Sequence, residues 1–359
     1  MFFTSYVDFL MSTNKTTNSN DKERDWRGPT IAEIAQESRV GTATVDRVVN
    51  GRSNVRESTR QKVISALERL KRPPVDSAHP SVKRIAFLSD SGDSFNKTLE
   101  SAVVGFSANK HDLDCSFTAI TTSKVDPVKF ANLIERTASE VDGLVIVARE
   151  DLIINRAIRN VVSRKTPVVC LTTDLPTSGR HTYVGSDATS AGSTAAYLMG
   201  QVVGNREGKI LLVYSAPYRA QEEREMGFRR ILRSEFPKLT VDERVNSNDD
   251  TEYVYQNVVR YIEEHGEPAG IYNVAGGNVG IGKAIHQFNL TGKTVFIGHE
   301  LNPNSRQLLE TGIMNFAIGH DVLSEVEAAT HDVVALLDKK PLTIVQQPRV
   351  RIYTKYSCN

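Results

Sequence analysis

The chain has little cysteine, a single tryptophan and no long run of hydrophobic residues. Its three cysteines, Cys115, Cys170 and Cys358, lie far apart and show neither a metal-binding spacing nor a disulfide framework. This usage is typical of a reducing compartment. No stretch of 18 apolar residues occurs, so the sequence predicts no membrane span.

The amino-terminal residues lack the features of a secretory signal. The first eleven residues, MFFTSYVDFLM, are apolar, but no basic region precedes them and they contain Asp8. The next residues, STNKTTNSNDKERD, are polar and low in complexity, so we predict that residues 1–27 form a disordered tail. Together with the cysteine usage, these features favour a cytoplasmic protein.

Catalytic motifs are also missing. GGNVGIG at 276–282 is similar to a dinucleotide-binding fingerprint. However, it does not follow the first strand of a domain, and no acidic residue stands at the required distance after it. No phosphate-binding loop and no G-x-S-x-G motif occur, and the His and Asp residues show no catalytic spacing. The sequence therefore predicts that the protein is not an enzyme, and it predicts no cofactor and no metal site.

What the chain does have is an uneven distribution of charge. Its 359 residues suffice for two or three domains, and 44 Lys and Arg nearly balance 43 Asp and Glu. Residues 39–72 hold nine basic and three acidic side chains, a net charge of +6, so the rest sums to −5 against a total of +1. This asymmetry indicates that the amino-terminal part binds a polyanion.

The basic part has the pattern of three short helices. Thr30 and Glu33 have the spacing of a capping box, and Thr42 stands at an N-cap position after a tight turn. Pro73 and Pro74 end the third helix, because proline removes a backbone donor and clashes with the preceding turn. The predicted helices lie over residues 30–38, within 40–51 and over 56–72.

The second of these helices has one apolar face and one polar face. Thr44, Asp46, Arg47 and Asn50 point outward, and Thr, Arg and Asn are residue types that contact bases and phosphates. Two short helices, a tight turn and such a face predict a helix-turn-helix. The alternative is a small helical bundle whose polar face is merely solvated.

The stretch TIAEIAQESRVGTATVDRVVNGRSNVRESTRQKVISAL closely resembles the DNA-binding region of the lactose-repressor (LacI) family. That region runs T-x-x-x-V-A-x-x-A-G-V-S-x-x-T-V-S-R-V-x-N, then a loop, then T-R-x-x-V. The resemblance implies binding to double-stranded DNA, with Thr42 and Ala43 selecting bases. It implies that five residues mostly position the DNA backbone: Thr30, Arg47, Asn50, Asn54 and Thr59. The residues that match are Thr30, Ala35, Val40, Thr44, Val45, Arg47, Val48, Asn50, Val55, Thr59, Arg60 and Val63.

Asp46 departs from this pattern, because the family usually has serine there. The side chain lies one turn after Thr42 and one turn before Asn50, so it can orient either of them. It can also accept a hydrogen bond from a cytosine N4, or hold Arg47 in one rotamer. A purely local role at the start of the helix is the remaining alternative.

The segment KRPPVDSAHPS at 71–81 lacks the Ala-Arg-x-Leu core of the family's hinge helix. Its three prolines predict an extended linker, which we place at 73–82, between a helix-turn-helix domain at 28–72 and a larger domain at 83–359.

Strands alternate with amphipathic helices in the larger domain. This order predicts parallel sheets covered by helices on both faces, and the length predicts two lobes. We expect the chain to cross between the lobes near residues 185, 312 and 341. The predicted strands cover 84–89, 113–120, 143–148, 168–172, 209–214, 269–275, 294–299 and 315–320.

Four stretches of this domain resemble the type I periplasmic-binding-protein fold: YVGSDATSAGSTAAYLMG, REMGFRRIL, GIYNVAGGNVGIGKAI and FIGHELNPNSRQLLETG. The resemblance implies a small polar ligand between the lobes, at the carboxyl ends of the strands. Asp187 could instead cap a helix, and Arg224 could lie on a surface helix. The candidate effector-binding residues are Asp90, Asp93, Phe95, Asp187, Arg224, Asn278, Glu300 and Asp321.

These patterns together predict a transcription regulator, specifically a repressor. We expect a homodimer on a pseudo-palindromic operator and an effector that is a sugar or sugar derivative. Two alternatives stay open at this point: a solute-binding receptor for a sugar transporter, and a sugar-processing enzyme.

Overall fold

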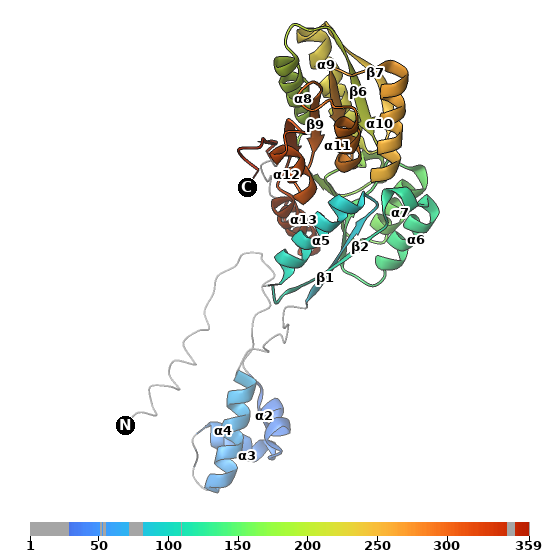
Figure 1. Ribbon diagram of the computed structural model, residues 1–359. Helices are drawn as coiled ribbons and strands as arrows, with labels where there is room; N and C mark the ends of the chain where they lie inside the picture. Colours follow the sequence, from blue (N-terminus) through green and yellow to red (C-terminus); the bar gives the residue numbers. More distant parts are fainter. Residues whose placement is uncertain are drawn as a thin grey trace. The chain divides into compact units, whose positions relative to one another are not determined.

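The structure is a computed structural model. The chain forms two compact units, Met1–His79 and Pro80–Asn359 (Figure 1). The described residues are 29–50, 52, 55–71, 82–108, 110–342 and 349–358. The predicted tail at 1–27, the predicted linker residues up to 81 and the candidate Asn54 lie outside them.

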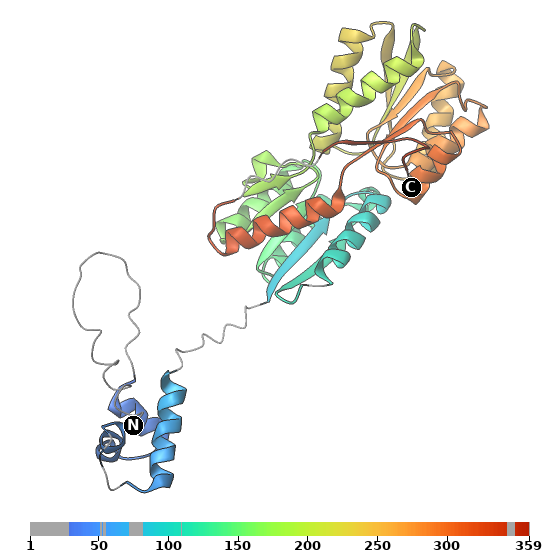
Figure 2. The same cartoon turned by 90° about the vertical axis from the view of Figure 1, so that its left-hand side faces the viewer.

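The described residues of the first unit form the helices α2 (Ile31–Ser38), α3 (Thr42–Val49) and α4 (Glu57–Lys71). The three helices lie close together (Figure 2), and their side chains enclose a small apolar core. Thr30 begins α2 with the predicted capping box: its hydroxyl accepts from the Glu33 backbone N–H, and the Glu33 carboxylate accepts from the Thr30 N–H at 2.7 Å. The core residues are Ile34, Val45, Val48 and Val63.

The turn between α2 and α3 differs in detail from the sequence prediction. Arg39 ends α2 in the left-handed conformation, with φ of 53°. Gly41, not Thr42, is the N-cap of α3, and it offers no side-chain oxygen. Thr42 is therefore already helical, and its side chain is exposed on the first turn. The prediction that Thr42 caps the helix was wrong, because the turn needs one residue fewer than we assigned to it.

The second unit contains two sheets, which confirms the predicted α/β architecture with parallel sheets. The first has the strand order β2-β1-β3-β4-β5, and all its pairs are parallel. The second has the order β11-β10-β9-β8-β6-β7, and only β11 is antiparallel. The strands are β1 (Lys83–Ser89), β2 (Leu113–Ala119), β3 (Gly143–Val147), β4 (Val168–Leu171), β5 (Thr182–Val184), β6 (Gly208–Tyr214), β7 (Leu239–Asn246), β8 (Gly270–Asn273), β9 (Val295–His299), β10 (Phe316–Gly319) and β11 (Arg351–Tyr353).

Helices cover both faces of each sheet, and each sheet with its helices forms one lobe. In the first lobe, α5 (Asp93–Ser107) and α13 (Val322–Leu337) pack on one face, and α6 (Pro127–Thr137) and α7 (Leu152–Ser163) on the other. Figure 2 shows α13, in orange-red, lying along this lobe. The second-lobe helices are α8 (Ala188–Val203), α9 (Arg219–Glu235), α10 (Thr251–His265), α11 (Asn278–Gln287) and α12 (Pro303–Glu310).

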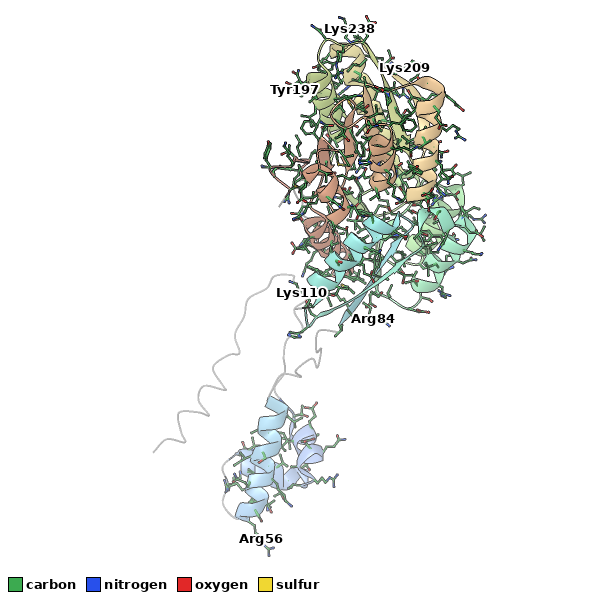
Figure 3. All side chains as sticks on the ribbon, in the orientation of Figure 1. Arg56, Arg84, Lys110, Tyr197, Lys209 and Lys238 are labelled. Atoms are coloured by element: carbon green, nitrogen blue, oxygen red, sulfur yellow. The ribbon has the colours of Figure 1, made fainter. Side chains whose placement is uncertain are left out.

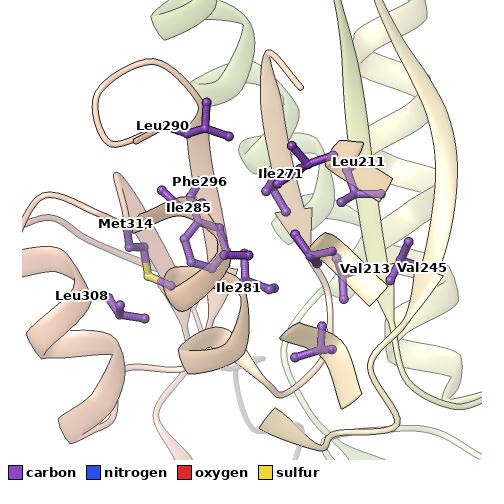
Figure 4. Close-up of a cluster of buried hydrophobic side chains, with 14 of the residues drawn as sticks. Leu211, Val213, Val245, Ile271, Ile281, Ile285, Leu290, Phe296, Leu308 and Met314 are labelled. Carbon is purple, nitrogen blue, oxygen red and sulfur yellow. The ribbon is translucent and has the colours of Figure 1, made fainter. Parts of the chain in front are cut away.

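Strand periodicity explains the two-faced cores. Ile85 and Phe87 contact the α5 side, whereas Ala86 and Leu88 contact the α6 side, because successive side chains of a strand point to opposite faces. Figure 4 shows one second-lobe core, in which Phe296 packs among aliphatic side chains from neighbouring strands and helices. Both faces are apolar, so the central strands are recognisable in the sequence as continuous hydrophobic runs.

The chain crosses between the lobes three times, after β5, after β10 and after α13. The middle crossing lies at His320 and Asp321, later than the expected position near 312, because β10 still pairs with β9 in the second lobe. Three edge strands, β5, β7 and β11, were not predicted. β7 is largely exposed and polar, and β5 and β11 are only three residues long, so none forms a hydrophobic run.

Candidate effector cleft and nucleic-acid interface

A cleft of about 750 Å³ lies between the two lobes of the second unit. Its walls are formed by segments that directly follow β1, β4, β6, β7, β8 and β9. The carboxyl ends of the strands of both sheets therefore meet at the cleft, as expected for parallel α/β folds. First-lobe residues on the wall include Ser91, Asp93, Phe95 and Thr172, and second-lobe residues include Arg224, Asp249, Asn278 and Glu300.

Arg224 is a buried cation on the cleft wall. It lies on α9 and is only 8% exposed. Its Nη1 donates to the backbone oxygen of Val274 at 3.0 Å, and Nη2 lies 3.9 Å from Glu300 Oε1. Its Nε finds no hydrogen-bond partner among the described residues. A buried donor without a partner is unfavourable, so this atom is a ready donor for an acceptor within the cleft.

Glu300 follows β9 and lies opposite Arg224. Its backbone is in the left-handed conformation, with φ of 68°, which is unusual for a residue with a side chain. The carboxylate accepts from His320 Nε2 at 3.1 Å. Burial raises the pKa of Glu300, but the charge and hydrogen bond of His320, aided by Arg224, bring it below its usual value. Glu300 is therefore an anion at neutral pH.

Asn278 begins α11 and joins three segments of the second lobe. Its Nδ2 donates to the His299 backbone oxygen at 3.0 Å and to Ser305 Oγ at 3.3 Å, and its Oδ1 accepts from Asn273 at 2.7 Å. These contacts hold the strand ends in place. In the first lobe, Asp93 begins α5 on the cleft wall, and the Phe95 ring lies 6.3 Å from the His320 ring.

The structure does not bring three of the predicted effector residues to the cleft wall. Asp90 is fully buried behind it, where its carboxylate pairs with Arg149 Nε at 2.8 Å. Asp187 caps α8 and accepts from the Ser190 N–H at 2.9 Å. Asp321 caps α13 and pairs with Arg351 at 2.6 Å. Helix caps and ligand-binding carboxylates share one sequence pattern, so Asp187 and Asp321 could not be told apart from ligand-binding residues by sequence.

Asp249 lies on the cleft wall, and sequence reasoning missed it. Its Oδ1 accepts from the Gly276 N–H at 2.7 Å, and its Oδ2 accepts from Thr122 Oγ1 of the first lobe at 2.6 Å. Asn248 and Asp249 both have a positive φ, which Asn and Asp tolerate best. The turn sequence Asn-Asp-Asp was the available signal, but it follows the unpredicted β7.

Further hydrogen bonds join the lobes. Tyr218 Oη donates to the Asp90 backbone oxygen at 2.6 Å, and burial raises the pKa of this tyrosine well above its usual value. Asn302 donates to Ser94 at 3.0 Å across the cleft. The lobes are thus held in one specific arrangement by contacts that a rotation of the lobes would break.

Carboxylates outnumber cations on the cleft wall. Burial lowers the pKa of His299 well below its usual value, so this histidine is neutral. The acidic residues are Asp93, Asp249, Asp250, Glu252 and Glu300, and the basic residues are Lys97 and Arg224.

In the first unit, the outward face of α3 contains an internal hydrogen bond. Asn50 Nδ2 donates to Asp46 Oδ1 at 2.7 Å, and Arg52 lies 3.8 Å from Asp46 Oδ2. Asp46 therefore orients Asn50, one of the alternatives left open above, and it does not hold Arg47. Arg56, just before α4, projects outward from this unit (Figure 3).

The other predicted DNA-contact residues are distributed over the surface of the same unit. Thr44 and Thr59 are half-buried. The exposed ones are Thr30, Thr42, Ala43, Arg47 and Asn50.

Within the described part of the chain, no helix is both long and apolar enough to cross a membrane. The same residues contain no group of three or more His, Cys, Asp or Glu side chains placed to hold a metal ion.

Comparison with known proteins matches both units. Residues 30–72 match the family model of bacterial regulatory proteins, lacI family, and residues 85–341 match the periplasmic binding protein domain. The fold and the cleft thus define a two-lobed binding protein with a helix-turn-helix unit. Over most of its length the chain belongs to the periplasmic binding protein domain family, and its residues 30–72 are a helix-turn-helix of the type found in bacterial regulatory proteins of the lacI family. The matched models describe a binding-protein domain and regulatory proteins, in agreement with the prediction that the chain is not an enzyme.

Curated relatives are similar mainly at the helix-turn-helix. Catabolite control protein A of Priestia megaterium is 56% identical over 41 residues, 11% of this chain and 12% of the relative. The regulator pepR1 of Lactobacillus delbrueckii is 49% identical over 45 residues, 12% of this chain and 14% of the relative. Catabolite control protein A of Staphylococcus epidermidis is 30% identical over 151 residues, 40% of this chain and 44% of the relative. The matches thus span less than half of these relatives.

Solved structures are similar in fold to the second unit. A glucose-galactose binding protein from Geobacillus stearothermophilus has a TM-score of 0.70 at 18% identity, over 77% of this chain and 98% of its own. A transporter solute-binding protein from Agrobacterium vitis with bound D-fucose has a TM-score of 0.70 at 20% identity, over 76% of this chain and 96% of its own. At this identity the similarity shows the two-lobed fold alone.

Proposed function

We propose that this protein is a sequence-specific DNA-binding repressor whose operator affinity is controlled by an uncharged sugar bound between the lobes. The observation that carries the proposal is the polar cleft. A buried arginine on its wall has an Nε without a hydrogen-bond partner among the described residues, and the other unit of the chain is a lacI-family helix-turn-helix. A transporter receptor would have the cleft but no use for that unit.

The face of α3 supports the DNA-binding part of the proposal. Thr42 and Ala43 begin the helix, are exposed and are small, so they fit against base edges and thymine methyl groups. Arg47 and Asn50 lie on the same exposed face and suit contacts to phosphate and to base edges. We propose a cytoplasmic homodimer that places one such face on each half of a pseudo-palindromic operator.

The charge of the cleft supports an uncharged ligand. Five carboxylates face two cations on the wall, a formal excess of three negative charges. The amino termini of α5, α9 and α11, whose N-cap residues make no side-chain hydrogen bond, offset part of it, since each contributes about half a positive charge. The remaining negative field repels phosphate and carboxylate groups, whereas carboxylates and Arg224 bind hydroxyls well. Sugar-bound relatives of the same fold, with D-fucose and D-arabinose, agree with this class.

Control of DNA binding requires that the sugar bind one lobe arrangement better than another. The cleft wall comes from both lobes, so a sugar that contacts both favours one angle between them. In the homodimer, that angle sets the spacing of the two helix-turn-helix units and thereby the affinity for the operator.

The test is a mobility shift of the full chain on DNA from upstream of its own gene, with and without a panel of sugars. A thermal-shift screen first finds which of D-glucose, D-galactose, D-xylose and D-fucose bind, because a ligand at 100 times its Kd stabilises the protein by about 2.7 kcal/mol. Glucose 6-phosphate and glucuronic acid are the matched anions, and we expect neither to bind. Sugar binding without any operator binding would favour the transporter receptor.

We expect Arg224→Ala to abolish the response to the sugar and to leave operator binding within a few-fold. Loss of a buried charge-assisted hydrogen bond costs roughly 1.5–3 kcal/mol of sugar affinity. Arg233→Ala is the matched control, because this arginine lies on the same helix with an exposed side chain that donates to a backbone oxygen of α9. Calorimetry that finds equal sugar affinity in Arg224→Ala and the unmodified protein would contradict the proposal.

A further inference from the structure

A row of buried polar side chains leads from the cleft wall of the second lobe to α13 of the first lobe. Glu300 Oε1 accepts from His320 Nε2 at 3.1 Å, and His320 Nδ1 forms an ion pair with Glu325 Oε1 at 2.7 Å that lacks hydrogen-bond geometry. Thr172, at the end of β4, donates to Glu325 Oε2 at 3.0 Å. The row therefore begins at the proposed sugar site and ends in the core of the other lobe.

The position of His320 gives the row its significance. His320 and Asp321 form the segment by which the chain passes from β10 in the second lobe to α13 in the first. The two ring nitrogens contact opposite lobes, one through Glu300 and the other through Glu325. A rotation of one lobe against the other turns this segment, so both contacts cannot keep their geometry during the rotation.

Burial makes these contacts strong. The side chains of His320 and Glu325 are 2% and 0% exposed, and Glu300 is 23% exposed. Burial lowers the pKa of His320, but its two carboxylate partners raise it well above its usual value. The imidazole is therefore a cation held between two carboxyl groups, and breaking either contact leaves a buried charge without one of its partners.

Both ends of the row have an unusual backbone. Glu300 has φ of 68° and Thr172 has φ of 61°, in the left-handed region that β-branched residues strongly avoid. Such conformations persist only where surrounding contacts hold them. The row of hydrogen bonds and ion pairs supplies such contacts at the ends of β9 and β4.

We propose that His320 is a positioning residue that couples occupation of the cleft to the angle between the lobes. This inference rests on the function proposed above. A sugar hydroxyl that binds Glu300 changes how firmly this carboxylate holds His320, and His320 passes the change to Glu325 and α13. His320 and Glu325 are not on the cleft wall, so their role is to position other groups and not to bind the sugar.

The first experiment measures the lobe angle directly and needs neither sugar nor DNA. Spin labels are attached to Leu152→Cys in the first lobe and Met226→Cys in the second, on a Cys115→Ser background; both sites are exposed, at 83% and 59%. Pulsed electron spin resonance then gives the distribution of distances between the lobes. We expect His320→Gln and Glu325→Gln each to broaden or shift the distribution, because the bridge that favours one angle is broken.

Asp332→Asn is the matched control, because Asp332 is a buried carboxylate on the same helix and its ion-pair partner is the neighbouring His331. It should leave the distribution unchanged. Distributions of both bridge variants that superimpose on that of the unmodified protein would overturn the inference. An equal broadening by Asp332→Asn would also overturn it, since the effect would then be a general loosening of α13.

The second experiment uses whichever sugar of the panel raises the melting temperature. For each protein, the operator Kd measured with that sugar is divided by the operator Kd measured without it. In Glu325→Gln this ratio should be at least fivefold closer to one than in the unmodified protein. The affinity for the sugar itself should change by only a few-fold. An unchanged ratio would overturn the coupling. If no sugar binds at all, the proposed function fails, and the distance measurement still decides whether His320 sets the lobe angle.

Discussion

The substitution Asp46→Ser tests how the recognition surface is organised. Asp46 accepts a 2.7 Å hydrogen bond from Asn50 and lies 3.8 Å from Arg52, so it fixes the direction of the Asn50 amide on the exposed face of α3. Serine is shorter and cannot reach Asn50 in the same geometry. We therefore expect the substitution to release the Asn50 side chain and to leave α3 folded, because Asp46 is not its N-cap.

The magnitudes distinguish a local role from a role in base selection. If Asn50, held by Asp46, contacts a base edge, releasing it relaxes the preference at one base pair per half-site by about 1–3 kcal/mol, roughly 5- to 150-fold in affinity. If the hydrogen bond is only local, stability falls by about 0.5–1.5 kcal/mol and base preference stays the same. Removing a carboxylate near phosphate then raises affinity for all operators alike.

The assay is selection of bound sequences from randomised operators, carried out with the unmodified protein, Asp46→Ser, Asn50→Ala and the double variant. Coupled residues give a double variant whose base preference equals that of Asn50→Ala alone. Identical preferences for the unmodified protein and Asp46→Ser, with a uniform gain in affinity, would refute the reasoning.

Two further predictions concern stability. A Cβ added at Gly192 would lie 1.8 Å from the backbone oxygen of Arg224, so Gly192→Ala should force α8 and α9 apart. Urea titrations should then show a loss of about 1–3 kcal/mol or more in the free energy of unfolding, and sugar binding should weaken because Arg224 is displaced. The pKa of His320 is higher in the folded protein than the value of about 6.5 in the unfolded chain. Protonated His320 therefore stabilises the fold fully below about pH 6.5, and this stabilisation is lost as the pH rises through the higher folded-state pKa. The free energy of unfolding should therefore decline more steeply above pH 7 in the unmodified protein than in His320→Gln, and parallel pH profiles would argue against a charged His320.

The sequence alone determined those features that depend on neighbours along the chain. The capping box of Thr30 and Glu33 and the apolar face of α3 are signals over three to five residues, and they sufficed for the helix-turn-helix. The buried strands were equally clear, because a strand covered on both faces is a continuous apolar run. The order of strands and helices then predicted a two-lobed α/β fold.

Only the tertiary structure decided which polar residues reach the cleft. Asp93 and Glu300 are on the wall, whereas Asp187 and Asp321 cap helices and Asp90 pairs with Arg149. All follow strands, and an acidic residue after a strand looks the same whether its side chain turns toward the ligand or toward the next helix.

The contacts between lobes could not be predicted either, since Ser94 and Asn302 are 208 positions apart and Thr122 and Asp249 are 127 apart. Periodicity and capping describe interactions within a few residues, so they contain no information on pairs that only the packing of two lobes brings together. His320 shows the limit most clearly: its charge, its two partners and its place between the lobes all arise from burial, which the sequence around it does not encode locally.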